Sequence, residues 1–309
     1  GGERSLSESG LNATGAKAVL NIGHWFTHTG IIHAHTPGDS ELRYYSRRHW
    51  KVPKFVDNHN AYFLEGKDEF LDAPLEWTYD PVEKLIKIVT PNNVEPSTLK
   101  LRGRRLEYAF TLANAQNVTL KNFDLFALGI WASADKTKFD MYNITWENVN
   151  FWYPSAQKRM LGYVDEGMPT SLFQSGHNKA INIDFEMTNC TFYGSESTPT
   201  RFRGGGMRFR NNNFLYNDWT AVTAKPVNPH DGNTLPYTGS GMMKLSPATS
   251  QKPNEFIRND IHVCGNSAPF YAARNSIVRY NYISGGKDLQ NDGSAIQGSG
   301  VNPKNMFLD

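Results

Sequence analysis

Apolar and other residues alternate in short phrases through the middle of the chain, and an asparagine interrupts each phrase. The clearest copies are Asn117–Leu125 and Asn143–Phe151, which share the order apolar, variable, apolar, variable, Asn, apolar, variable, apolar. Looser copies lie at 183–192, 207–216, 256–263 and 277–283. A period of two predicts strands, and asparagine tolerates the left-handed backbone of a sharp bend. Each phrase is therefore predicted to be two strands that meet at an asparagine elbow.

These elbows recur along the chain. The interrupting asparagines are spaced by 26, 41, 24, 46 and 22 residues, at Asn122, Asn148, Asn189, Asn213, Asn259 and Asn281. The intervals indicate a repeat of about two dozen residues. We interpret the interval of 46 as two repeats, with a hidden one centred on Gly241–Leu245. We interpret the interval of 41 as one repeat with an insertion around Tyr153–Asn178.

A repeat of this size cannot bury its apolar face alone, so the copies must stack, each strand pairing in parallel with its equivalent in the next copy. The predicted fold is all-β, a parallel β-helix of roughly eight rungs, about 40 Å long at about 4.8 Å per rung. A β-sandwich of unequal strands is the alternative. The predicted interior contains Val118, Leu120, Ile144, Trp146, Ile183, Phe185, Met207 and Phe209.

The first third of the chain lacks this repeating pattern. Residues 1–75 are irregular, whereas Leu75–Pro81 and Lys84–Thr90 predict a strand, a tight turn and a strand. An open end of a β-helix would expose apolar side chains and unpaired backbone groups, so we predict that residues 1–110 form an N-terminal cap with leading strands and that 111–309 form the rungs. Asn305–Asp309 has the pattern of another rung. We therefore expect a C-terminal continuation or a second chain to stack there.

Composition narrows the function. The 32 Lys and Arg nearly balance the 30 Asp and Glu, for a net charge of +2, which argues against nucleic acid as a partner. No apolar run approaches the roughly 18 residues of a membrane helix, so no membrane span is expected. Aromatic residues make up 13% of the chain, and aromatic faces stack on sugar rings. A carbohydrate ligand is therefore compatible with the composition.

At this point the sequence resembles a known group of proteins. Glu69–Pro81, the apolar strand after it, and Asn117–Phe123 resemble the opening of secreted right-handed parallel β-helix glycoside hydrolases, among them fucosidases and xylan-active enzymes, in the wider pectate-lyase-like group. The same rhythm continues in Asn275–Ile283 and Asp288–Ile296. The resemblance implies a right-handed β-helix, a polysaccharide or oligosaccharide substrate, and a secreted, cell-surface or periplasmic location. Polysaccharide lyases share this fold, so the resemblance does not choose the reaction.

Hydrolysis of a glycosidic bond typically uses two carboxyl groups that flank the bond. Asp218 follows the phrase that ends at Tyr216, while Asp288 and Asp292 follow the phrase that ends at Ile283. By the rung count above, Asp218 and Asp292 lie about three rungs, or roughly 15 Å, apart. Asp292 is thus the preferred catalytic carboxylate, and Asp288 or a group beyond residue 309 is a better partner than Asp218. As ordinary turn residues, Asp218 and Asp292 would instead cap backbone amides.

Four further residues are predicted substrate contacts. Trp219 offers a stacking face beside Asp218, and His230 lies in the proline-rich insertion Lys225–Tyr237 as an acid, base or simple solvated loop residue. Lys244 and Arg274 fall in later rungs.

Together with Arg201, Arg203, Arg208 and Arg210, these two cations would suit an acidic or sulfated glycan, unless they are simply solvated charges on outward strand positions. That arrangement favours the alternative function, a lyase that eliminates across a uronate. No cofactor is predicted, except Ca²⁺ if the protein is a lyase. The pair His33 and His35 lacks an identifiable third ligand, so no metal site is predicted. The remaining alternative is a non-catalytic rod that binds glycans.

Overall fold

A computed structural model of the 309-residue chain describes residues 5–23, 26–45, 62–106, 108–113, 115–133, 141–154, 184–196, 199–203, 205–217, 243–246, 252–265, 268–272, 275–286, 294–298 and 306–308. Two compact units are present, one within Gly1–Gly103 and the other formed by most of the chain from Arg104 onward. The predicted division between residues 110 and 111 falls inside a strand of the second unit, Tyr108–Ala113. Whether residues 1–110 cap the rungs stays a prediction.

The N-terminal unit contains a four-stranded antiparallel sheet in the order β3-β2-β1-β4. Its strands are β1 (Lys17–Gly23), β2 (Phe26–Ala34), β3 (Arg43–Tyr45) and β4 (Tyr62–Glu65). A single-turn helix, α1 (Leu6–Ser9), begins at a capping box between Ser5 and Glu8. The short 3₁₀ turns η1 (Asp68–Phe70), η2 (Pro91–Asn93) and η3 (Pro96–Thr98) follow the sheet in the sequence.

The predicted strand–turn–strand element is confirmed. Strand β5 (Trp77–Asp80) pairs antiparallel with β6 (Leu85–Ile88). One carboxylate oxygen of Asp80 accepts hydrogen bonds from the backbone N–H groups of Val82 (3.0 Å) and Glu83 (3.1 Å), which closes the turn. The same two bonds hold the pKa of Asp80 below its ordinary value, because they favour the ionised carboxylate.

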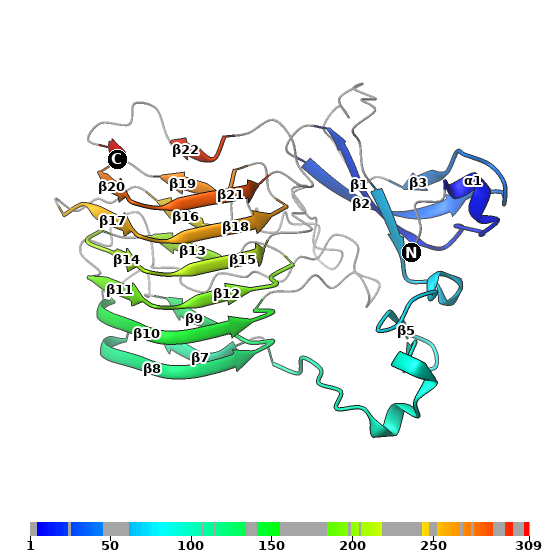
Figure 1. Cartoon of the computed structure of the whole chain (residues 1–309), viewed down its shortest axis with the longest axis horizontal. Coiled ribbons are helices and arrows are strands. Elements are labelled where there is room, and N and C mark those ends of the chain that lie inside the picture. The colour runs from blue at the N-terminus through cyan, green and yellow to red at the C-terminus, as the bar shows by residue number, and fades with distance from the viewer. Residues whose placement is uncertain are drawn as a thin grey trace. The chain divides into compact units, whose positions relative to one another are not determined.

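The second unit is a parallel β-helix, which confirms the predicted fold class. Its strands stack in sequence order (Figure 1), and successive turns of the chain, the rungs, build three parallel ladders. Ladder 1 contains the first halves of β8 (Gln116–Phe126) and β10 (Tyr142–Trp152), then β11 (Phe185–Thr188), β14 (Arg208–Arg210), β17 (Asn254–Ile257), β20 (Ser276–Arg279) and β23 (Met306–Leu308).

Ladder 2 contains the second halves of β8 and β10, then β12 (Thr191–Tyr193), β15 (Asn213–Asn217), β18 (Asp260–Cys264) and β21 (Tyr282–Gly286). Ladder 3 contains β13 (Thr200–Arg203), β16 (Met243–Ser246), β19 (Phe270–Ala272) and β22 (Ile296–Gly298). In the first rungs, the parallel pair β7 (Tyr108–Ala113) and β9 (Gly129–Ser133) precedes and follows β8.

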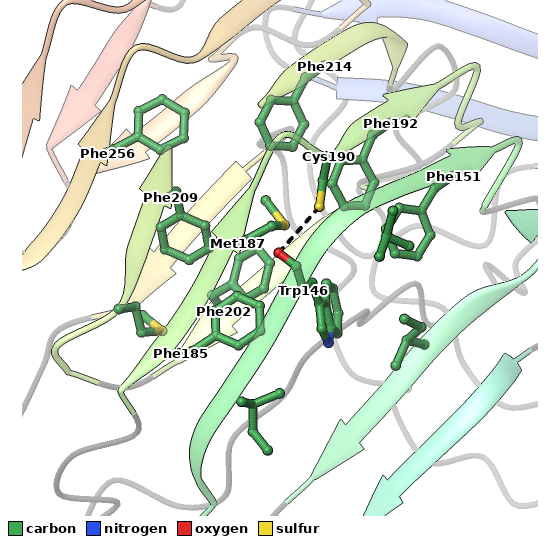
Figure 2. Close-up of a cluster of buried hydrophobic side chains, with 14 of the residues drawn as sticks. Trp146, Phe151, Phe185, Met187, Cys190, Phe192, Phe202, Phe209, Phe214 and Phe256 are labelled. Atoms are coloured by element: carbon green, nitrogen blue, oxygen red, sulfur yellow. Dashed lines mark hydrogen bonds between the residues drawn. The ribbon is translucent and has the colours of Figure 1, made fainter. Parts of the chain in front are cut away.

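Equivalent apolar residues stack inside the rungs, as Figure 2 shows. In ladder 2, the rings of Phe151 and Phe192 stack at 4.4 Å and those of Phe192 and Phe214 at 5.1 Å. Burial of each such ring contributes about 1.5–3 kcal/mol. The interior prediction is confirmed for Leu120, Ile144, Trp146, Phe185, Met207 and Phe209, while Val118 is partly buried and Ile183 lies outside the described residues.

Two left-handed residues mark the corners of each described rung around ladder 2. The first elbow, between ladders 1 and 2, has positive φ at Asn122, Asn148, Asn189, Asn211, Arg258 and Tyr280. The second elbow, at the end of ladder 2, has positive φ at Ala127, Tyr153, Gly194, Tyr216, Val263 and Gly285. The prediction of an elbow is therefore right for the first three asparagines and wrong for Asn213, Asn259 and Asn281.

The misassigned asparagines Asn259 and Asn281 lie one residue beyond the elbow, where their side chains turn inward with that of Asn212. The backbone N–H of Cys190 donates to Oδ1 of Asn212 (2.9 Å), that of Asn212 to Asn259 (3.0 Å), and that of Asn259 to Asn281 (2.8 Å). The side-chain amides of these asparagines donate in turn to carbonyls of the preceding rung. We call these three residues the buried asparagine ladder.

The predicted hidden rung is absent. Strand β14 pairs directly with β17, and β15 pairs directly with β18, so the 46-residue interval is one rung. Met243–Ser246 is instead the ladder 3 strand of that same rung. The extra residues lie in the connection that precedes it. The interval of 41 is likewise a single rung, because β10 pairs with both β11 and β12.

Candidate functional site

Five of the seven predicted site residues fall in segments that connect ladder 2 to ladder 3, while Lys244 is on a ladder 3 strand and Arg274 follows one. Segment 218–242 joins β15 to β16, and segment 287–295 joins β21 to β22. Six of the seven predicted site residues lie outside the described residues: Asp218, Trp219, His230, Arg274, Asp288 and Asp292. Lys244 is described in its backbone, on β16. Along the chain, all seven thus flank or occupy the ladder 3 strands.

The predicted spacing between Asp218 and Asp292 needs correction. Strand β15 pairs with β18, and β18 pairs with β21, so the strands that precede these two residues are two strand spacings apart rather than three. Two spacings correspond to about 10 Å. The error came from the hidden rung, which added one strand that ladder 2 does not have.

Lys244 occupies a defined position in ladder 3. It is in register with Arg201 on β13 and with Tyr271 on β19, and Tyr271 is in register with Gln297 on β22. Two basic residues therefore occupy equivalent backbone positions in adjacent rungs of the ladder that the carboxylate-bearing segments enter.

Two arginines of the predicted cationic row contact carboxylates of neighbouring rungs. Arg208 lies 3.2 Å from Glu186, and Arg210 lies 2.6 Å from Glu255. On the first two rungs, Lys121 pairs with Glu147 at 2.8 Å. These partly exposed pairs compensate charge along ladder 1, so Arg208 and Arg210 are poorly suited to hold an anionic substrate.

The second elbow carries a row of exposed aromatic side chains that sequence reasoning did not identify. Phe126, Trp152 and Tyr193 are in register on three successive strands of ladder 2. Tyr153 and Tyr216 follow at the elbow itself. Ring contacts join Phe126 to Tyr153 (5.8 Å), Tyr153 to Tyr193 (5.8 Å), Trp152 to Tyr193 (5.4 Å) and Tyr193 to Tyr216 (5.5 Å). We call these five residues the aromatic strip.

The aromatic strip is solvent-exposed although its members touch. Trp152 is 38% exposed, Tyr153 48% and Tyr216 42%. The sequence signal was present: aromatic residues close the ladder 2 phrases at Phe126, at Trp152–Tyr153 and at Tyr193. We did not recognise this signal because these aromatic residues also fit the alternation of apolar and variable positions, which predicts strands and not a binding surface.

A polar column runs beside the aromatic strip on the same face of ladder 2. Asp124, Asn150 and Thr191 lie two residues before Phe126, Trp152 and Tyr193 of the strip, and Asn213 and Asp260 continue the column in register on the next two strands. The side-chain amide of Asn150 donates to Asp124 at 2.9 Å. The column contains hydroxyl, amide and carboxylate groups and no lysine or arginine.

The histidines near the N-terminus have a structural role at His35. Its Nδ1 accepts a hydrogen bond from the backbone N–H of Ala13 (3.1 Å), so Nε2 carries the proton and faces the carbonyl of Asp39 (3.2 Å). Within the part of the chain that the structure describes, no group of three or more His, Cys, Asp and Glu side chains could hold a metal ion.

The cysteines are buried in the second unit and do not pair with each other. Burial raises the pKa of Cys190 to about 11, since desolvation disfavours the thiolate. Its sulfur lies 3.7 Å from the carbonyl oxygen of Trp146, as Figure 2 shows. A thiol in this state is a poor nucleophile.

Comparison with family models, with curated proteins and with solved structures finds no match to this chain. Among the described residues, no helix is long and apolar enough to cross a membrane.

Proposed function

We propose that the chain is a glycoside hydrolase that acts on a polysaccharide or oligosaccharide bound beside ladder 3. The observation that carries the proposal is the chain position of the predicted site residues, all of which flank or occupy ladder 3 strands of a parallel β-helix. Long connections held by a rigid scaffold are where binding and catalytic residues concentrate. The proposal includes a secreted, cell-surface or periplasmic location, as the resemblance to secreted β-helix enzymes implies, and no cofactor.

The corrected strand spacing supports a second carboxylate for Asp292. Asp218 and Asp292 follow strands two spacings apart, about 10 Å, which is close to the roughly 6.5–9.5 Å between the carboxyl groups of inverting glycosidases. Asp218 is therefore a stronger candidate partner for Asp292 than the sequence analysis indicated, because that analysis placed the two residues three rungs apart. Asp288, four residues before Asp292, remains the other candidate.

The proposal is tested by replacing Asp292. We expect Asp292→Asn to lower the release of reducing ends from a panel of soluble polysaccharides at least about 100-fold, because the amide cannot donate or accept the catalytic proton. Asp39→Asn, at an exposed aspartate of the N-terminal unit, is the matched control and should keep the wild-type rate. Undiminished turnover by Asp292→Asn would remove this residue from the mechanism.

A polysaccharide lyase is the second candidate, and one observation favours it. Arg201 and Lys244 are in register on adjacent ladder 3 strands, and a lyase uses cationic residues to neutralise a uronate carboxylate and to remove the adjacent proton. In that case Ca²⁺ would be an additional cation that neutralises the uronate. Elimination creates an unsaturated product that absorbs in the ultraviolet, whereas hydrolysis does not.

One set of assays separates the candidates. The wild-type protein is incubated with neutral and acidic polysaccharides, with and without Ca²⁺, and both reducing ends and ultraviolet absorbance are recorded. New reducing ends without absorbance support hydrolysis, and absorbance on acidic polymers supports elimination. Saturable binding without either product would support a non-catalytic rod and would contradict the proposed function.

A further inference from the structure

The second elbow contains residue types that its backbone does not favour. Tyr153 and Tyr216 have φ of 54° and 53°, in the left-handed region where a Cβ is crowded and where glycine and asparagine are preferred. At the first elbow, four of the six described residues are asparagine. The two tyrosines therefore cost backbone energy that asparagine would avoid, and what they add is an exposed ring.

The packing around these tyrosines holds the rings in place. A Cβ built on Gly194 would lie 2.7 Å from two ring carbons of Tyr153, so the absence of a side chain at Gly194 lets that ring lie against the backbone. The backbone N–H of Tyr153 donates to the carbonyl of Tyr193 (2.7 Å), and the ring of Tyr193 contacts those of Trp152, Tyr153 and Tyr216. The aromatic strip is thus a pre-organised surface across four rungs.

From these observations we propose that the aromatic strip and the polar column together bind a neutral polysaccharide, in a site distinct from the reaction site proposed beside ladder 3. Aromatic faces accept the apolar faces of sugar rings, and amide, hydroxyl and carboxylate groups hydrogen-bond sugar hydroxyls. The proposal deepens the proposed function by naming a substrate class, and it rests on that function for the view that the ligand is a glycan.

The charges of the polar column favour a neutral polysaccharide over an anionic one. The polar column contributes Asp124 and Asp260 and contains no lysine or arginine, so a uronate or sulfated chain would meet like charge there. Three described cations of ladder 1, Lys121, Arg208 and Arg210, are each paired with a glutamate. At the first elbow, the guanidinium of Arg258 lies over the ring of Tyr280, 5.6 Å from its centroid. A neutral polymer avoids this repulsion and uses the carboxylates as hydrogen-bond acceptors.

The test uses the full chain with Asp292→Asn as the background, so that binding is measured without turnover. Affinity electrophoresis is run in native gels that contain xylan, mannan, mixed-linkage β-glucan or polygalacturonate. The strip variants are Tyr216→Asn, Tyr153→Asn and Trp152→Ala. The two tyrosine variants remove a ring while keeping a residue that suits the left-handed backbone, so they should fold. Tyr142→Ala is the control, because Tyr142 is 41% exposed at the opposite end of β10.

We expect the background protein to be retarded by at least one of the neutral polymers and not by polygalacturonate. Each strip variant should bind that polymer about tenfold more weakly, and Tyr142→Ala should bind unchanged. The proposal is overturned if no neutral polymer retards the protein, if polygalacturonate alone does, or if the strip variants bind as tightly as the background. It is also overturned if the strip variants change only the oligomeric state on size-exclusion chromatography, since the strip would then bind a second copy.

Failure of this proposal and failure of the proposed function are distinguishable. Hydrolysis of short soluble oligosaccharides depends on the reaction site and is assayed with the catalytic aspartate restored. Strip variants that hydrolyse short substrates normally but lose retardation by the polymer support both conclusions. Retardation without any hydrolysis would retain the aromatic strip as a binding surface and remove the enzymatic assignment.

Discussion

At the scale of single residues, the left-handed positions decide where the chain bends. The first elbow is occupied by asparagine in the first four described rungs, a residue that tolerates this backbone. The second elbow tolerates glycine and alanine but also carries Val263, with φ of 52°. A β-branched residue in this region is strained, because its Cβ substituents crowd the neighbouring backbone. Replacing Val263 by a residue that tolerates this backbone should therefore stabilise the fold.

Val263→Asn tests this view of the elbow. We expect the substitution to raise the free energy of unfolding by about 1 kcal/mol and the melting temperature by a few degrees, because asparagine relieves the left-handed strain. Ile257→Asn is the control, since Ile257 is also half-buried but lies outside the positive-φ positions. Thermal unfolding followed by circular dichroism measures both. A loss of stability in Val263→Asn equal to that in Ile257→Asn would show that side-chain packing, and not the elbow, governs this site.

At the scale of the strand ladders, the buried asparagine ladder links rungs through side chains as well as backbone. Asn212 and Asn259 are fully buried, yet their amide groups are hydrogen-bonded on both sides. Cys190 occupies the equivalent position one rung earlier, where its thiol lies 3.7 Å from the carbonyl oxygen of Trp146 and its backbone N–H donates to Asn212. The ladder therefore begins at Asn212 among the described rungs and fixes the register of the three rungs that follow Cys190.

Removal of the central member of this ladder should be costly. Asn259→Ala leaves the backbone N–H of Asn212 and the carbonyl of Phe209 without their side-chain partner in a buried site. We expect a loss of about 2–4 kcal/mol in the free energy of unfolding, measured by urea titration. Asn213→Ala, at an exposed asparagine of the adjacent strand, should change stability by less than about 0.5 kcal/mol. Equal effects of the two substitutions would contradict the role of the ladder.

At the scale of the whole molecule, the two units have unequal cores. The second unit buries a cluster that includes Trp146 and eight phenylalanines, whereas the buried cluster of the N-terminal unit contains Leu6, Leu20, Ile32 and three alanines. Because buried apolar area is the main stabilising contribution, the β-helix should be the more stable unit.

Hydrogen exchange in increasing urea tests this difference. We expect the amides of β1 and β2 to lose protection at lower urea than those of β12 and β14. Both cysteines lie in the second unit, so thiol labelling reports its opening independently, and Cys190 should stay unlabelled until that unit opens. Burial raises the pKa of the Cys190 thiol to about 11. Its contribution to the free energy of unfolding is therefore fully present below pH about 9 and is lost as the pH rises through about 11. Simultaneous loss of protection in both units would contradict the prediction.

The sequence predicted the architecture better than its details. Alternation and the asparagines identified the parallel β-helix, because both act through local backbone geometry. The assignment of Asn259 and Asn281 to elbows failed, because an inward-pointing asparagine that bonds the preceding rung and a left-handed asparagine look alike in sequence. Asn213 is instead an exposed residue of ladder 2, two residues beyond the elbow at Asn211. The prediction of a hidden rung was wrong because the ladder 3 strand Met243–Ser246 has the alternating pattern of part of a repeat. The ion pairs of Arg208 and Arg210 and the aromatic strip depend on register between rungs, which no single phrase contains.

The described rungs differ greatly in length, and the largest differences lie in the segments that leave the end of ladder 2. The first elbow is a single residue in each described rung, whereas the connection from β15 to β16 spans residues 218–242 and that from β18 to β19 only residues 265–269. The scaffold is thereby insulated from changes in these segments. Exchange of whole segments between rungs, or grafting of foreign ones after Asn217, should alter what the molecule recognises while leaving its framework intact, which makes this corner the natural place for both evolutionary diversification and engineering.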